Sequence, residues 1–183
     1  MPQELDLELW LNQSLIQRQN QLKADFLALF EQLGNSFTNA ELTQFFSNSK
    51  GKKISTGNQL QGYPYLVLDL IRDFDLDSGC TIRLVSWFGH GLFCCVFFGK
   101  NLKFPSEPFL KEGFHLGDPN TPWDLPTQIE WLKKSKPTQD LEQGATLWIK
   151  EILLPAEKNQ GIQLMKEQVN KILQVKPISG IKI

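Results

Sequence analysis

The chain has 183 residues, of which 41% are hydrophobic and 21% charged, and this balance excludes a disordered protein. Nineteen basic against 20 acidic residues give a net charge of −1, which argues against a protein whose main task is binding nucleic acid. A chain of this length buries enough surface to fold as a single domain, 1–183, without a disulfide or a metal ion.

The N-terminal residues and the cysteines favour a cytoplasmic protein. The chain starts MPQELDLELWLNQSL, which lacks the basic beginning of a secretory signal. No stretch approaches the 18 or so apolar residues of a transmembrane helix, so we expect no membrane contact. Cys80, Cys94 and Cys95 have neither the number nor the spacing of a disulfide framework. We therefore expect three buried, reduced thiols.

Residues 1–49 are expected to form an N-terminal helical segment. Over 4–33, apolar residues recur every three or four positions, which predicts one long helix that Gly34 ends. Thr38 and Glu41 have the spacing of a capping box, so a second, shorter helix should begin at Thr38.

Residues 63–154 are expected to be mainly antiparallel sheet. Tyr65–Phe74, Cys80–Phe88 and Leu92–Gly99 read as strands joined by turns too short for a crossover, which predicts a three-strand meander. The last hairpin should turn at His90. Because Leu92–Gly99 is apolar on both faces, we expect it to lie centrally, with cover on both sides of the sheet.

Less regular segments flank this meander. Residues 50–62 are polar and glycine-rich, which predicts a loop or a weak edge strand. A proline-rich loop is expected at 104–126, then a helical turn over Thr127–Lys134 and a strand over Thr146–Leu154. An apolar stripe predicts a C-terminal helix at 156–176. The fold class is therefore α+β: an antiparallel β-meander sheet with N-terminal helices and a C-terminal helix packed on it.

The two histidines are the candidate catalytic residues, because the imidazole pKa lies near neutral pH. His90 lies between two glycines at the predicted hairpin tip, where its alternative role is that of a turn residue. His115 precedes Asp118 by three residues, so this carboxylate could orient the imidazole or only hold the loop. Neither histidine has neighbours at zinc-ligand spacing, so we expect no metal site. Nucleotide-binding motifs are absent as well, and we expect no cofactor.

Asp69 and Arg83 interrupt two very apolar predicted strands. If the turn between the strands centres near Leu76, the two residues lie within one position of each other and form a cross-strand ion pair. The alternative is that both face a cavity, where Arg83 holds an anionic ligand through two hydrogen bonds. An unpaired buried charge would cost several kcal/mol, so each charge needs a partner.

Aromatic residues cluster in the middle of the chain, and most of them, Trp87 included, fit a packed core. Trp123 lies instead in the proline-rich loop, where an aromatic side chain more often marks a binding surface. The candidate ligand-binding residues are Asp69, Arg83, Trp87 and Trp123, in a cleft between the sheet and the proline-rich loop.

The favoured function is a non-enzymatic binding module for a small apolar ligand or a protein partner. The alternative is a hydrolase or transferase that uses His115 or His90 with Asp118 or Asp69. A pocket with converging His, Asp and Arg side chains would favour the enzyme, whereas an apolar cavity with one or two polar groups would favour ligand binding.

The two ends of the chain carry opposite charges. Residues 1–49 hold six acidic and two basic residues, a net charge of −4, and 158–183 hold five lysines and one acid, a net charge of +4. The two segments could therefore pack within one chain, or between two chains in a homodimer formed through the N-terminal helix.

Overall fold

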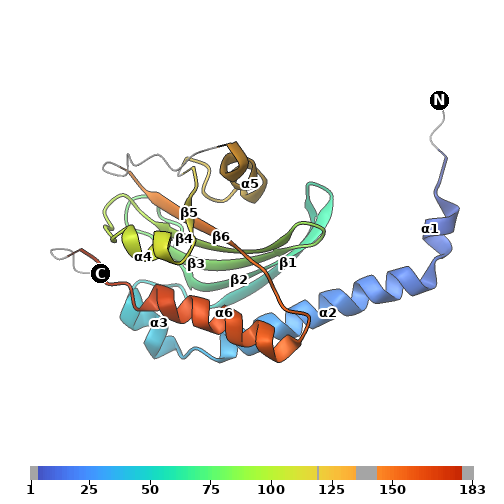
Figure 1. Cartoon of the computed structure of the whole chain (residues 1–183), viewed down its shortest axis with the longest axis horizontal. Helices are drawn as coiled ribbons and strands as arrows, with labels where there is room; N and C mark the ends of the chain where they lie inside the picture. Colours follow the sequence, from blue (N-terminus) through green and yellow to red (C-terminus); the bar gives the residue numbers. More distant parts are fainter. Residues whose placement is uncertain (1–3, 119, 135–143, 179–183) are drawn as a thin grey trace.

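The computed structural model describes residues 4–118, 120–134 and 144–178, and it has the α+β fold that the sequence predicts (Figure 1). In these residues six strands form one antiparallel sheet in the order β1-β2-β3-β4-β6-β5. The strands are β1 (Lys53–Leu60), β2 (Tyr63–Arg72), β3 (Cys80–Trp87), β4 (Gly91–Phe98), β5 (His115–Leu116) and β6 (Thr146–Ile152). The helices are α1 (Leu7–Leu11), α2 (Gln13–Asn35), α3 (Asn39–Phe45), α4 (Glu107–Lys111), α5 (Leu125–Lys134) and α6 (Lys158–Leu173).

The predicted meander is confirmed, because β2, β3 and β4 are antiparallel neighbours in the sheet. Its last hairpin turns at His90, whose amide N–H donates to the Trp87 carbonyl over 2.9 Å. Gly89 and Gly91 adopt positive φ angles of 81° and 133°, which glycine reaches at little cost because it lacks a Cβ. Residues 50–62 supply the edge strand β1 rather than a loop.

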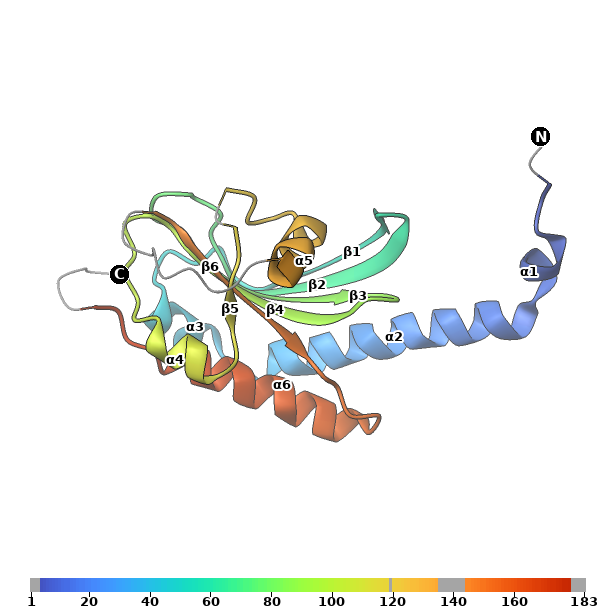
Figure 2. The same cartoon turned by 45° about the horizontal axis from the view of Figure 1, so that its top comes forward.

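Strand β4 lies between β3 and β6 and is buried on both sides, as its apolar sequence predicts. On the first face of the sheet, Val96 and Phe98 belong to a core shared with α2, α3 and α6. On the second face, Phe93 and Phe97 belong to a core shared with α5. Figures 1 and 2 show α2, α3 and α6 below the sheet and α5 above it. The sheet is therefore the middle layer of three.

The N-terminal helix departs from its prediction at two places. The sequence predicts one helix over 4–33, but α1 and α2 are separate because Asn12 caps α2. The Asn12 side-chain oxygen accepts from the Leu15 amide N–H (3.0 Å), and this local hydrogen bond favours a new helix start. The predicted end at Gly34 is also wrong, because Gly34 is a buried residue inside α2.

Other boundaries move by a few residues. Helix α6 starts two residues later than the predicted stretch 156–176, because the Glu157 carboxylate caps its first amides. The predicted loop 104–126 contains α4 and the short β5, and its position 119 lies outside the described residues. The expected turn over Thr127–Lys134 is the helix α5. No helix in the described part of the chain is both long and apolar enough to cross a membrane.

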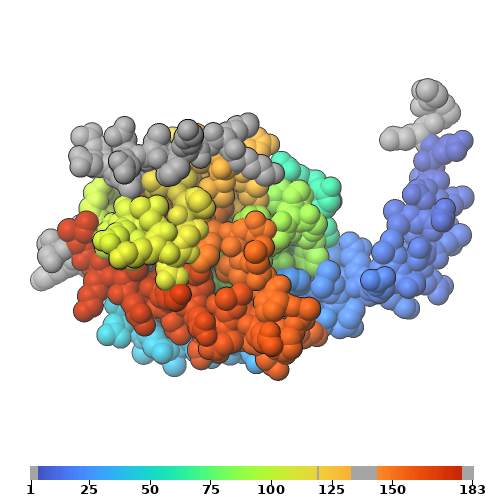
Figure 3. Space-filling view, in the orientation of Figure 1, coloured from blue at the N-terminus to red at the C-terminus, as the bar shows by residue number. Residues whose placement is uncertain are grey.

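The two oppositely charged ends meet within one chain, but only along part of α2. The Lys158 ammonium of α6 contacts the Asp25 carboxylate of α2 at 2.7 Å. Residues 5–23, which we call the arm, project away from the rest of the molecule (Figures 1 and 3). Every described large apolar side chain of the arm is exposed. The predicted packing within one chain therefore accounts for the C-terminal half of α2 and leaves the arm uncovered.

The capping box of α3 is formed as the sequence predicts, and its contribution to stability can be measured. The Glu41 amide donates to the Thr38 hydroxyl (3.2 Å), while the Thr38 amide donates to the Glu41 carboxylate (2.7 Å). We expect Thr38→Ala to lower the free energy of unfolding by about 1 kcal/mol, because a helix N–H loses its partner. Urea denaturation measures this loss. Thr38→Ser is the control and should retain most of the stability, whereas an unchanged Thr38→Ala protein would contradict a stabilising cap.

Candidate ligand-binding site

Three charged residues lie side by side in a row across the neighbouring strands β1, β2 and β3. Lys53 of β1 lies opposite Asp69 of β2, Asp69 opposite Arg83 of β3, and Arg83 opposite Cys95 of β4. Residues that face each other across antiparallel strands project to the same side of a sheet. The row therefore lies on the second face, the one that α5 covers at Cys95.

Asp69 and Arg83 form the cross-strand ion pair that the sequence predicts. Arg83 donates from Nε to Oδ1 of Asp69 (2.7 Å) and from Nη2 to Oδ2 (3.2 Å), so the carboxylate is held by two parallel hydrogen bonds. The Asp69 side chain is only 4% exposed and that of Arg83 19%. The guanidinium carbon lies 5.2 Å from the Phe74 ring centre and 5.6 Å from the Trp123 ring. Both charges and both aromatic rings thus form one compact group.

The same ion pair also lines a cavity, so pairing with each other does not keep the two charges away from a possible ligand site. A pocket of about 270 Å³ lies between the second face of the sheet and the segment Pro122–Gln128. Asp69 and Arg83 supply its charged groups, and Trp123 lines it as well. Its remaining lining is mainly apolar and includes Leu60, Tyr65, Val67, Val85, Cys95 and Leu125. Three of the four predicted ligand-binding residues therefore lie at one site.

Trp87, the fourth predicted residue, has a different position. Its ring is buried, and its indole N–H donates to the Leu60 carbonyl (3.1 Å), which ties the β1–β2 hairpin to β3. His90 stacks on Trp87 with 3.6 Å between ring centres and meets the Tyr63 ring edge-on at 4.8 Å. Neither Trp87 nor His90 lines the pocket. In this arrangement both rings pack at the hairpin tip.

His115 and Asp118 are not joined by a hydrogen bond or ion pair in the described part of the chain. His115 is exposed on the edge strand β5, opposite Ile149. The Asp118 carboxylate instead accepts from the Asn120 amide N–H (2.9 Å) and from the Thr121 hydroxyl (3.3 Å). The geometry therefore assigns Asp118 to holding its loop and supplies no acid–base pair here.

Sequence reasoning missed Gln128, which fixes the loop that covers the pocket. Its side-chain amide donates to the carbonyls of Asp118 (2.9 Å) and Thr121 (2.8 Å), and its oxygen accepts from the Asp118 N–H (2.8 Å). Gln128 is fully buried and lines the pocket. The sequence could have indicated this role, because Gln128 lies three residues after Leu125 on the apolar stripe of α5. A polar side chain on a buried stripe needs hydrogen-bond partners within the protein.

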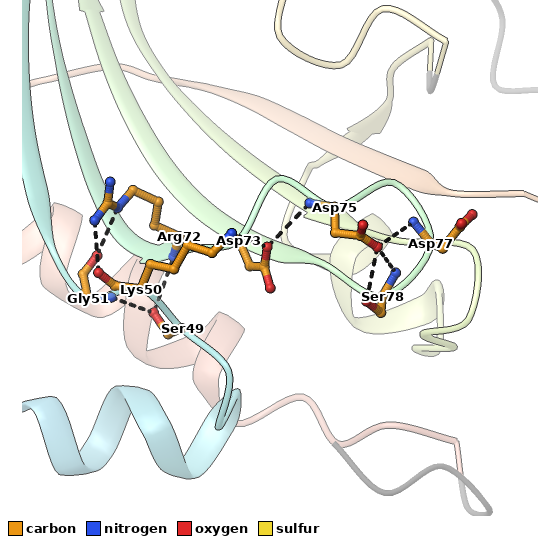
Figure 4. Close-up of polar contacts among 8 residues, drawn as sticks. All are labelled: Ser49, Lys50, Gly51, Arg72, Asp73, Asp75, Asp77 and Ser78. Carbon is orange, nitrogen blue, oxygen red and sulfur yellow. Dashed lines mark hydrogen bonds and ion pairs between the residues drawn. The ribbon is translucent and has the colours of Figure 1, made fainter.

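A second polar cluster follows β2, where acidic residues alternate along the chain (Figure 4). Asp75 accepts from the amides of Asp77 (3.0 Å) and Ser78 (2.7 Å), and these hydrogen bonds, led by that from Ser78, lower its pKa. Asp73 accepts from the Asp75 amide (3.3 Å) and from the Lys50 ammonium (3.0 Å). These carboxylates shape the β2–β3 turn. In the described residues, no three His, Cys, Asp or Glu side chains are grouped to hold a metal ion.

The three cysteines are free and buried, as the sequence predicts. Burial is the main reason why the pKa of each thiol is raised, for Cys95 to about 12. Cys95 lies beside the pocket, and the nearby Arg83 charge only partly offsets this effect of burial. A thiol with so high a pKa remains protonated near neutral pH, so the pocket offers no thiolate nucleophile.

Comparisons with protein families, with curated proteins and with solved structures found no match to this chain. What the site can do is therefore inferred from its geometry. It combines an apolar cavity, one buried ion pair and an aromatic side chain from a loop. This combination suits the binding of a small molecule more than acid–base chemistry, because the described histidines lie elsewhere.

The buried ion pair leads to a stability prediction. We expect Asp69→Asn to lower the free energy of unfolding by about 3 kcal/mol, because Arg83 is left largely buried without a countercharge. The double variant Asp69→Leu/Arg83→Leu should recover most of this loss, since it leaves no unpaired charge. Urea denaturation of the three proteins checks this. A single variant as stable as the parent chain would show that Arg83 does not need Asp69.

The thiols lead to a pH prediction. In the unfolded chain they ionise near pH 9, whereas in the folded chain their raised pKa keeps them protonated. Stability is therefore complete below about pH 9 and falls as the pH rises toward 12, by up to ~1.4 kcal/mol per pH unit for each thiol. Denaturation midpoints between pH 8 and 10.5 measure the slope. Cys95→Ala should make it shallower, and an identical slope would contradict the burial of that thiol.

Proposed function

We propose that this protein is a non-enzymatic binding module whose pocket under Trp123 takes a small, largely apolar ligand with one carboxylate. The observation that carries this proposal is the unfilled edge of the Arg83 guanidinium. Arginine has five N–H groups, and Asp69 accepts from Nε and from one N–H of Nη2. In the described residues nothing accepts from the other three, of which one on Nη1 and one on Nη2 form the Nη1–Nη2 edge. A ligand carboxylate matches this edge.

The charge of the row supports a single negative charge on the ligand. Lys53, Asp69 and Arg83 lie next to one another across three strands and together carry a net charge of +1. Lys53 is exposed and does not line the pocket, whereas Asp69 and Arg83 do and balance each other there. One carboxylate on the ligand would balance the positive charge of the row, and a cation would add to it.

The shape of the pocket supports a small ligand with an apolar body. Its volume of about 270 Å³ lies just below the usual range for ligand sites, which suits a small molecule, and its walls include Val67, Val85 and Leu125. Trp123 comes from a loop and is 38% exposed, so its ring can pack on a bound molecule.

The alternative of a hydrolase or transferase has less support from the geometry. Such an enzyme needs a base within hydrogen-bond reach of its substrate. His90 packs against Trp87 at the hairpin tip, and His115 lies on the edge strand β5. Asp69 lines the pocket but is held by Arg83. A ligand in the pocket would therefore meet an ion pair and no imidazole.

We also propose that the chain is cytoplasmic and that it self-associates through the N-terminal helix. Three buried free thiols support a reducing compartment. Self-association is supported by the arm, whose large apolar side chains are each at least 40% exposed: Leu5, Leu7, Leu9, Trp10, Leu11, Leu15, Ile16 and Leu22. Exposed apolar surface of this extent is typical of interaction sites. The near-neutral net charge does not favour nucleic acid as the partner.

The ligand proposal is tested with simple aromatic acids. We expect benzoate, phenylacetate or indole-3-acetate to shift the NMR signals of the Arg83 Nε–H and the Trp123 indole N–H. The matching neutral amides should bind more weakly, because they cannot accept a charged, bidentate hydrogen bond. Equal binding of acids and amides, or no shift at either residue, would contradict the proposed role of Arg83.

A matched pair of tryptophan variants tests the place of binding. Trp123 is 38% exposed and lines the pocket, whereas Trp131 is 40% exposed and does not. We expect Trp123→Ala to weaken acid binding several-fold or more, because a stacking surface worth about 1 kcal/mol is lost. Trp131→Ala should leave the affinity unchanged. If the two variants behave alike, the acid binds elsewhere.

A further inference from the structure

The uncovered part of α2 continues a stripe whose other part is buried. Leu29, one heptad after Leu22 and two after Leu15, is buried against the first face of the sheet together with Phe30 and Leu33. Leu15 and Leu22 have the same spacing but are 46% and 47% exposed. The helix therefore presents one continuous apolar face, and its N-terminal half lacks the cover that its C-terminal half has.

An open apolar groove lies close to the C-terminal end of the arm. It has a volume of about 710 Å³ and is formed where β6 leads into α6. Its apolar residues are Leu153, Leu154, Pro155 and Leu164, of which Leu153 is 80% exposed. An exposed leucine next to further apolar side chains is a surface that a partner would cover.

We infer that the arm of one copy of this chain binds in the Leu153–Leu164 groove of a second copy, and that the second arm binds the first groove in return. This inference rests on the proposed self-association and names the surface that receives the arm. The partner is thus an identical chain, and the contact joins an apolar helix face to an apolar groove.

Charge supports this pairing of arm and groove. The exposed part of α2, residues 13–24, contains Arg18 and Lys23 and no acidic residue. The groove has Glu157 and Glu167 among its lining residues and no basic one. Because Asp6 and Glu8 make the arm as a whole neutral, charge favours the placement of residues 13–24, rather than α1, against the groove.

The position of the groove allows a closed dimer. The ion pair between Asp25 and Lys158 holds the C-terminal end of the arm beside the first turn of α6, where the groove lies. Ten helical residues separate Asp25 from Leu15, a distance of about 15 Å. Because each arm starts next to the groove of its own chain, two chains related by a two-fold axis can exchange arms, and both grooves are filled.

The area of the contact is sufficient for a stable dimer. Covering a leucine side chain completely is worth ~1.5–3 kcal/mol, equivalent to roughly 60–120 Å² of apolar surface. The apolar side chains of each arm are already partly covered, but two arms and the two grooves that receive them would together remove on the order of 1,000 Å² from water. Specific interfaces begin near this size.

The test compares three double variants of the full chain by light scattering at two protein concentrations. The arm variant is Leu15→Glu/Leu22→Glu, and the groove variant is Leu153→Glu/Leu164→Glu. The control is Leu76→Glu/Leu110→Glu, two leucines that are 48% and 50% exposed and lie in neither surface. All six substituted leucines are at least 38% exposed, so the variants should fold, and their circular dichroism spectra and thermal unfolding verify this.

We expect the parent chain and the control to have about twice the single-chain mass of 21.0 kDa, and the arm and groove variants to have the single-chain mass. An equimolar mixture of the arm and groove variants should form a heterodimer, because it contains one intact arm and one intact groove.

Two results would overturn the inference, and they are distinguishable. If the parent chain has the single-chain mass at both concentrations, the proposed self-association itself fails. If the parent chain and the groove variant dimerise equally while the arm variant does not, self-association stands and the arm binds a surface other than this groove.

Discussion

Strand β4 is buried on both of its sides, and this burial constrains how the helices pack on the sheet. Every residue from Leu92 to Phe98 is apolar and buried, so the sheet cannot leave either face open to water at its centre. The first face is covered by α2, α3 and α6, and the second by α5 (Figure 2). A hydrophobic strand of this kind is stable only in the middle of three layers.

The helices on the two faces cover different shares of the sheet, and the candidate site lies on the less covered second face. Helix α5 has 10 residues and a length of about 15 Å, whereas six strands spaced by about 4.8 Å make a sheet roughly 24 Å wide. It adds Leu125, Ile129 and Leu132 to the core on the second face, and a hollow of about 270 Å³ remains beside Leu125. Charged residues are tolerated there, and the Asp69–Arg83 pair lies at the floor of the remaining hollow.

The sequence predicts those features that depend on neighbouring residues, and fewer of those that depend on distant ones. The capping box at Thr38, the hairpin at His90 and the central place of β4 follow from local spacing and are confirmed. The Asp69–Arg83 pair also follows, because one short turn sets its register. The cap at Asn12 was missed because a side-chain cap competes there with a continuous helix. The role of Gln128 was missed because its partners lie in a loop seven to ten residues before it. The place of Trp123 in a proline-rich loop marked it as a binding residue, and it lines the pocket. Trp87, on a strand, also fitted a packed core, and it packs at the hairpin tip.

We expect burial on both sides to make β4 the most stable part of the fold, and residue-resolved amide hydrogen exchange measures this local stability. Exchange from a core strand requires global unfolding, whereas an edge strand exchanges through local opening. We expect the amides of Cys94–Phe97 to exchange slowest, with the free energy of global unfolding, and those of β1 to exchange orders of magnitude faster. Equal protection of β1 and β4 would contradict the expectation that burial on both sides makes β4 the most stable part of the fold.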